Sequence, residues 1–147
     1  MTIYRRPSKP VQWMNGFMSW LASKGIAPSR MITLDVKGRR SGHVRSTVVN
    51  VVEYEGEQYL VSPRGESEWV RNVRAAGGEA VIRHGGRQKV KLLEIIAAER
   101  APIIKKYLKE NTLSTKAHFG IGPDAPLEEF QRIAERHPVF RIIPGER

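Results

Sequence analysis

The chain has 147 residues, a length typical of one domain that buries a hydrophobic core. It carries 25 Lys and Arg against 15 Asp and Glu, and the formal net charge of +10 favours anionic partners. The absence of Cys excludes disulfides, thiolate nucleophiles and thiolate metal ligands.

The first part of the chain predicts a helix followed by a β-meander. Apolar residues recur at helical spacing from Pro10 to Lys24, so we expect an amphipathic N-terminal helix within residues 1–25. A glycine-bearing basic turn, Lys37–Arg45, separates the first two expected strands. The three strands of the meander are expected at Met31–Val36, Thr47–Tyr54 and Gln58–Ser62.

The second part alternates helices with strands. Helices are expected at Glu66–Ala76, Ala97–Lys109 and Pro126–Arg136, and strands at Glu79–His84, Arg87–Ile95 and Val139–Ile143. Residues 110–125 contain Gly and Pro and predict a flexible loop. Because the strands come in consecutive pairs, a closed or partly closed antiparallel barrel is favoured over a doubly wound α/β fold.

The densest chemical signal lies in the basic turn, between Gly38 and Arg45. Glycines let a backbone turn tightly and expose its amides, and arginines offer a planar fork of donors that matches phosphate oxygens. The Ser41 hydroxyl adds a further donor. The spacing fits no Walker or dinucleotide-binding motif, so a solvated hairpin tip explains the same residues equally well.

The order of this turn, the hydrophobic hairpin, Ser62-Pro63-Arg64-Gly65 and the Trp69–Arg74 segment resembles the deazaflavin-dependent nitroreductase family of actinobacteria, from about Ile32 to Ile95. The family motif reads Gly-Arg-Lys-Ser-Gly-x-x-Arg, and Arg40 stands here in place of the lysine. The resemblance implies a flavin-binding split β-barrel, mainly β (α+β) with short flanking helices, as a single domain over residues 1–147. It also implies coenzyme F-420, whose phosphate and polyglutamate tail is anionic.

Carried over position by position, the resemblance implies a set of cofactor-binding residues. Arg40 and Arg45 match the ligands of the phosphate and tail, and Trp69 and Asn72 match the helix that closes the pocket. The full expected set is Arg39, Arg40, Ser41, Gly42, Arg45, Val48, Val49, Asn50, Ser62, Arg64, Trp69 and Asn72. Without the resemblance, Trp69 would be assigned to the core and Asn72 to a local cap.

Several other site classes are not expected. The histidines His43, His84, His118 and His137 are dispersed without metal-ligand spacing, so no metal site is predicted. The chain also lacks the Gly-x-Ser-x-Gly elbow of serine hydrolases. Where family members carry tyrosines beside the substrate, this chain offers His118, Phe119, Phe130 and His137. No catalytic acid or base is assigned.

The sequence predicts an oxidoreductase that transfers a hydride from reduced coenzyme F-420 to an electron-poor acceptor such as a quinone, an enone or a nitroaromatic. Alternatives are a non-enzymatic fatty-acid or lipid-binding protein on the same fold, or an FMN- or haem-binding protein. Nucleic acid is disfavoured, since neither zinc-finger spacing nor an aromatic-rich RNA-binding strand is present.

We expect a cytoplasmic protein, because the chain has no run of apolar residues that could cross a membrane and no signal-peptide pattern. Its oligomeric state is expected to be a monomer or a homodimer. Trp13, Phe17 and Trp20 sit with Lys9 and Lys24 on the N-terminal helix. This helix either packs across the barrel or makes peripheral contact with a membrane.

Overall fold

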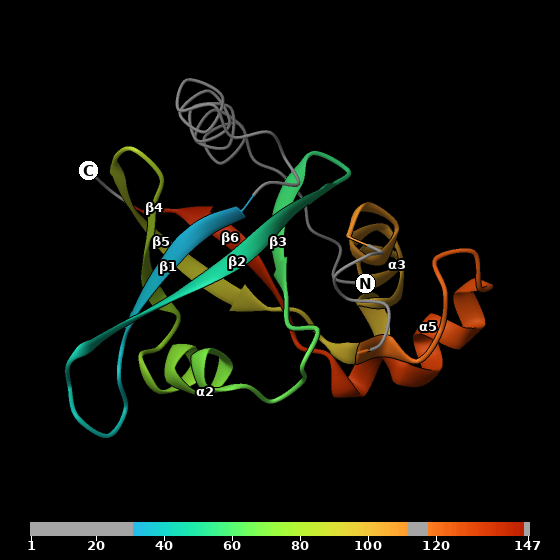
Figure 1. The fold of residues 1–147 in the computed structure, drawn as a ribbon, viewed down its shortest axis with the longest axis horizontal. Coiled ribbons are helices and arrows are strands. Elements are labelled where there is room, and N and C mark those ends of the chain that lie inside the picture. The colour runs from blue at the N-terminus through green and yellow to red at the C-terminus, as the bar shows by residue number, and fades with distance from the viewer. Residues whose placement is uncertain (1–30, 112–117, 146–147) are drawn as a thin grey trace.

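The computed structural model describes residues 31–111 and 118–145, and the strands within them form one closed antiparallel barrel (Figure 1). The order around the barrel is β1-β2-β3-β6-β5-β4, and pairing of β1 with β4 completes the circle. The strands are β1 (Met31–Lys37), β2 (Val44–Tyr54), β3 (Glu57–Val61), β4 (Glu79–Arg83), β5 (Arg87–Glu94) and β6 (Val139–Pro144). The mainly β, barrel-type fold class predicted from the sequence is confirmed.

Helices lie beside and below the barrel. They are α2 (Glu68–Ala75), α3 (Ala101–Glu110) and α5 (Leu127–Ile133), with 3-10 turns at Ala97–Glu99 and Ala134–Arg136. None of the helices within the described residues has the length and apolar character that a membrane crossing requires. The expected N-terminal helix, residues 1–25, lies outside the described residues, as do Trp13, Phe17 and Trp20.

Strand β2 changes its partner along its length, and this change opens the barrel on one side. Its first part, Val44–Asn50, pairs with β1, whereas only Val51–Tyr54 pairs with β3. Among the described residues, the edge of Val44–Asn50 that faces away from β1 therefore has no partner strand. A strand has two hydrogen-bonding edges, so this stretch of β2 leaves backbone donors and acceptors open beside the barrel.

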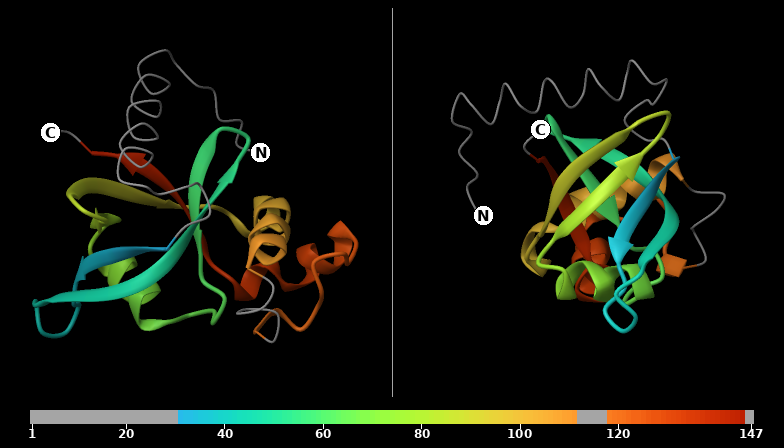
Figure 2. Two further views of the ribbon diagram at one scale, coloured as in Figure 1. Left: turned by 45° about the horizontal axis from the view of Figure 1, so that its top comes forward. Right: turned by 90° about the vertical axis from the view of Figure 1, so that its left-hand side faces the viewer.

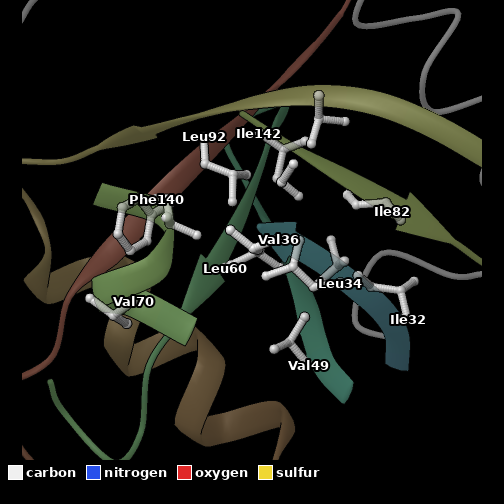
Figure 3. Packing of buried hydrophobic residues seen from close by; sticks show 14 residues of the cluster. Ile32, Leu34, Val36, Val49, Leu60, Val70, Ile82, Leu92, Phe140 and Ile142 are labelled. Carbon is white, nitrogen blue, oxygen red and sulfur yellow. The ribbon is translucent and has the colours of Figure 1, made fainter. Parts of the chain in front are cut away.

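Two hydrophobic clusters hold the elements together. The first fills the barrel, where Leu34, Leu60 and Ile82 are fully buried, and Val70 and Val73 of α2 close one end (Figure 3). The second lies outside the barrel, where α3 and α5 pack against the outward side chains Val52, Tyr59 and Val61 (Figure 2). Each large apolar side chain buried in this way contributes roughly 1.5–3 kcal/mol, so the barrel wall is fixed from both faces.

Two element boundaries differ from the sequence prediction for physical reasons. Strand β2 begins at Val44, ahead of the expected Thr47, because Val44, Arg45 and Ser46 pair with the end of β1. The helix expected at Ala97–Lys109 is interrupted at Arg100, and α3 begins at Ala101 with proline in its first turn. Pro102 has no N–H and tolerates only the first turn of a helix.

Helix α2 ends at two consecutive glycines that differ in their surroundings. Gly77 and Gly78 both have positive φ, of 68° and 89°, which L side chains rarely adopt. A Cβ on Gly78 would lie 2.6 Å from the carbonyl oxygen of Leu92, while a Cβ on Gly77 would meet nothing within 4 Å. The Gly78 carbonyl also accepts a hydrogen bond of 2.7 Å from the Leu92 amide. Gly78 therefore allows the end of α2 to touch the backbone of β5.

We expect Gly77→Ala to lower the free energy of unfolding by about 1 kcal/mol through backbone strain alone. Gly78→Ala should lower it by about 3 kcal/mol, because the β5 backbone must also move away. Urea denaturation of both variants measures the difference. Equal losses would show that the contact between Gly78 and Leu92 does not constrain the barrel.

Candidate functional site

A cleft of about 830 Å³ opens along the unpaired edge of β2. The opposite wall consists of the turn after β3 and of α2, and Tyr107 from α3 closes one end. The residues around it are Val36, Arg45, Ser46, Thr47, Val48, Val49, Asn50, Val61, Ser62, Pro63, Arg64, Ser67, Glu68, Trp69, Asn72, Tyr107 and His118. The cleft thus lies where the change of partner along β2 leaves the barrel open.

The structure brings most of the sequence-predicted residues together in this cleft. Those that line it are Arg45, Val48, Val49, Asn50, Ser62, Arg64, Trp69 and Asn72. Those that do not line it are Arg39, Arg40, Ser41 and Gly42, which lie in the turn between β1 and β2. Whether any of them binds a cofactor stays a prediction.

The turn between β1 and β2 is closed on itself. The Gly38 amide donates to the carbonyl of His43 at 2.7 Å, and the Gly42 amide donates to the carbonyl of Gly38 at 2.9 Å. The His43 amide donates to the Ser41 hydroxyl oxygen at 3.1 Å. The sequence analysis expected these amides to be exposed for phosphate, whereas the turn uses them internally. An anion bound here would contact the side chains of the turn.

Arg39 ties the tip of this turn to α2. Its amide and its guanidinium both donate to Oδ1 of Asn72, at 3.1 and 2.7 Å, and the guanidinium pairs with Glu68 at 3.0 Å. The hydrogen bond from Arg39 lowers the pKa of the Glu68 carboxyl, which stays ionised at neutral pH. Asn72 is buried, and its carbonyl oxygen holds the turn in place by accepting both hydrogen bonds from Arg39. Arg40 is exposed at the tip.

The turn after β3 is shaped by the buried Ser62. Its hydroxyl donates to the carbonyl of Gly65 at 2.6 Å and lies 3.2 Å from the hydroxyl of Ser67, which precedes α2. Gly65 has a φ of 79°, and a Cβ there would lie 2.9 Å from the carbonyl oxygen of Arg136. These contacts leave the side chain of Arg64 exposed at the rim of the cleft.

The apolar lining comes from β2 and α2. Val48 is 62% exposed, whereas its neighbour Val49 is part of the barrel core. Trp69 lines the cleft with one part of its ring system and packs on Phe140 of the core, with ring centroids 5.6 Å apart. The cleft therefore offers an apolar surface between the cationic side chains of Arg45 and Arg64.

Tyr107 is a cleft residue that the sequence analysis did not select. Its ring is buried, its hydroxyl hydrogen-bonds the Asn50 side chain, and its edge meets Phe119 at a centroid distance of 6.2 Å. Burial raises the pKa of the hydroxyl, so it stays protonated at neutral pH. In the sequence Tyr107 looks like a core residue, because it follows the apolar spacing of Ile103 and Ile104 in α3. Its hydroxyl, which needs a polar partner, was the one feature that could have identified it as a site residue.

His137 lies behind the turn that carries Arg64. Its Nδ1 lies 3.1 Å from the carbonyl oxygen of Ser62, and because a carbonyl only accepts, Nδ1 carries the proton in the neutral ring. The ring also lies against Phe119, with centroids 4.4 Å apart. Burial lowers the pKa of His137 below its usual value of 6.5, so the ring is neutral at pH 7.

This lowered pKa predicts a loss of stability in acid. Below pH 6.5 the unfolded chain takes up a proton at residue 137 before the folded chain does, so the stabilisation is present above pH 6.5 and is lost as the pH falls through the folded-state pKa. We expect His137→Gln, which keeps a donor for Ser62, to reduce the fall in unfolding free energy between pH 7 and pH 5.

Urea denaturation at the two pH values measures this effect. His84→Gln, at an exposed position beside the turn between β4 and β5, is the matched control. An equal reduction of the pH dependence in both variants would contradict the assignment to His137.

Comparison with known proteins places the chain beside F-420-dependent enzymes in sequence and beside barrel proteins in structure. Residues 20–117 match the family model described as F420H2-dependent quinone reductase. No curated protein sequence matches the chain.

Solved structures show the same fold at low sequence identity. A protein of unknown function from Agrobacterium tumefaciens is 16% identical with a TM-score of 0.56, and the match covers 80% of this chain and 49% of that one. Campylobacter jejuni ChuZ is 13% identical with a TM-score of 0.54, covering 96% of this chain and 55% of its own. The chain thus spans about half the length of these two proteins.

A structure described as an F420-H2 dependent reductase (FDR-A) shares 20% identity, with a TM-score of 0.48. That match covers 76% of this chain and 92% of the other.

Proposed function

The chain belongs to the F420H2-dependent quinone reductase family, and we propose that it binds reduced coenzyme F-420 in the cleft along β2 and reduces a quinone there. The observation that carries this proposal is the cleft itself, where an apolar surface lies between the cationic side chains of Arg45 and Arg64. This surface suits a ligand that combines a planar ring with an anionic tail.

The dimensions and chemistry of the cleft fit such a cofactor. Its volume of about 830 Å³ lies within the range of ordinary cofactor sites, roughly 300–1,000 Å³. Val48 and Trp69 would contact a planar ring, and the open edge of β2 offers backbone donors and acceptors to the polar rim of that ring. Arg45 would bind the phosphate or the tail through its planar fork of donors.

When bound, the reduced coenzyme supplies the hydride, so the chain needs no nucleophile of its own. The side chains bind, orient and exclude water. Trp69 is fixed by Phe140, and Asn50 is fixed by the Tyr107 hydroxyl, so both walls present ordered groups. The protonated Tyr107 hydroxyl would also donate a hydrogen bond to a carbonyl oxygen of the acceptor at the closed end of the cleft. Ordered walls favour transfer because the reacting atoms are held close together.

We expect Arg45→Ala to weaken the binding of coenzyme F-420 by about 10- to 100-fold, since a charged hydrogen bond contributes about 1.5–3 kcal/mol. Arg40→Ala should weaken binding less, because Arg40 lies at the exposed tip of the turn and does not line the cleft. Fluorescence titration with the oxidised and the reduced coenzyme gives both dissociation constants.

Arg87→Ala provides the matched control, because it removes one positive charge at the start of β5, away from the cleft. An equal loss of affinity for the coenzyme in Arg45→Ala and Arg87→Ala would show that only the net charge of the protein matters. It would contradict the proposed contact between Arg45 and the coenzyme. Wild-type protein that binds no coenzyme F-420 would overturn the proposal and favour the lipid-binding or FMN-binding alternatives.

A further inference from the structure

A second cavity of about 590 Å³ adjoins the cleft on the side of α5. Pro63, Arg64 and His118 line both spaces, so the two are neighbours across the turn after β3. The remaining lining comes from Gly65, from the 119–120 segment, and from the stretch between Arg132 of α5 and His137. The resemblance points to His118, Phe119 and His137 of this lining as the substrate side, but neither it nor the proposed cofactor site assigns a role to Arg132 or Arg136.

The second cavity is strongly cationic. Its lining includes Arg64, Arg132 and Arg136, and no carboxylate lines it among the described residues. Arg132 pairs with Glu129 at 2.7 Å, but both side chains are about half exposed, so water weakens that pair. Within residues 31–111 and 118–145, Arg64 and Arg136 have no hydrogen bond or ion pair from their guanidinium groups.

Part of the remaining lining is aromatic. Phe119 and His137 stand against each other, and the neutral His137 ring directs its only N–H to Ser62. The Nε2 atom of that ring is therefore an acceptor and adds no positive charge. The cavity thus combines cationic groups with aromatic side chains, a chemistry that suits an aromatic compound with a negative substituent.

The cationic side chains of the two spaces come from different parts of the molecule. Arg45, at the start of β2, lines the cleft, whereas Arg132 of α5 and Arg136 line the second cavity. In Figure 1 the turn between β1 and β2 and helix α5 lie on opposite sides of α2. A reductase binds two reactants at once, its coenzyme and its acceptor. If the cleft holds the anionic coenzyme, the second cavity is free to hold a charge on the acceptor.

Resting on the proposed function, we infer that the acceptor is an anionic quinone, whose carboxylate or sulfonate binds Arg132 and Arg136 while its ring reaches the cleft. In the reaction the quinone gains a hydride from the reduced coenzyme and a proton from water, and it becomes a hydroquinone. The coenzyme is oxidised and releases one proton to water, so that hydrogen and charge balance. The arginines take no part in the electron transfer; they bind and position the acceptor.

The test compares 1,4-naphthoquinone with 1,4-naphthoquinone-2-sulfonate as acceptors for the full chain and reduced coenzyme F-420. The variants are Arg132→Gln, Arg136→Gln and the double variant. Arg87→Gln, at the start of β5, is a control whose charge change equals that of each single variant, and β5 and α5 lie on opposite sides of the molecule (Figure 1). We expect the double variant to raise KM for the sulfonate on the order of tenfold, a change of about 1.4 kcal/mol. KM for the neutral quinone should stay unchanged, and circular dichroism should show that each variant is folded.

Two kinetic outcomes would overturn the inference. An unchanged KM for the sulfonate in the double variant would show that Arg132 and Arg136 do not bind the acceptor. An equal rise of this KM in Arg87→Gln would show that the effect comes from the overall positive potential of the protein. A loss of affinity for coenzyme F-420 in the double variant would assign the cavity to the coenzyme and not to the acceptor.

Calorimetric titration with the sulfonate alone separates this inference from the proposed function. If the wild-type protein binds the sulfonate, the double variant does not, and neither quinone is turned over, the anion site is supported and the proposed reductase function is refuted. Turnover of the neutral quinone without any binding preference for the sulfonate would keep the reductase and refute the anion site.

Discussion

The change of partner along β2 is the constraint on which the site depends. A fully paired barrel removes every open edge and fills its interior with side chains. Here β2 follows β1 over Val44–Asn50 and meets β3 only from Val51 onward, so the wall must separate between these two pairings. The double hydrogen bond from Arg39 to Asn72 then fixes the hairpin tip on α2. The width of the opening is set by α2, which stands between the separated strands.

The wall opposite β2 is held by a network of charges as well as by the apolar packing of α2 on the barrel core. Arg74 of α2 binds Glu66 in the turn after β3 and Glu94 of β5, with the contacts to Glu94 at 2.7 and 2.9 Å. Arg100 binds the same Glu94 at 3.1 Å and donates to the carbonyls of Ile95 and Ala134. Because Arg100 is buried, its loss would leave the Ile95 carbonyl without this donor, whereas Glu94 would keep Arg74 and the Ala134 carbonyl would keep the His137 amide.

This network links elements that the hydrophobic clusters keep separate. One cluster fills the barrel and the other lies beneath α3 and α5, while Glu94 stands at the end of β5 between them. The turn carrying Arg64 is therefore tied to both parts of the molecule, through Glu66 on one side and through the bond between Ser62 and His137 on the other. This arrangement fixes the backbone of the turn from which Arg64 reaches the rim of the cleft.

Local sequence signals predicted the elements well, whereas contacts between distant residues escaped them. The strand pairs followed from β-rich runs and from the turns between them, such as Glu55-Gly56. The break before α3 was missed, although Pro102 marks it. The internal use of the turn amides between Gly38 and His43 was not visible, since a glycine-rich turn and an open anion site share one sequence pattern. Tyr107 resembled an ordinary core residue, because its position follows the apolar spacing of α3. Val48, Asn50 and Trp69 were selected by family resemblance, because neither periodicity nor charge distinguishes them.

The net charge of the chain indicates an anionic partner, but the pairing of its arginines indicates where that partner would bind. Carboxylates pair with Arg39, Arg74 and Arg83, which are thereby committed to the fold or partly neutralised, whereas the half-exposed pair of Arg132 with Glu129 is weakened by water. In the part of the chain that the structure describes, Arg45, Arg64 and Arg136 have no such pairing, and all three line the cleft or the cavity beside it. Among the described residues, Arg40 and Arg71 also have no carboxylate partner, but they are exposed and line neither space. Guanidinium groups without a carboxylate partner along one continuous space add to the positive potential there. The positive potential that a ligand meets is therefore set by a few side chains on the rim of this space, and much less by the total charge.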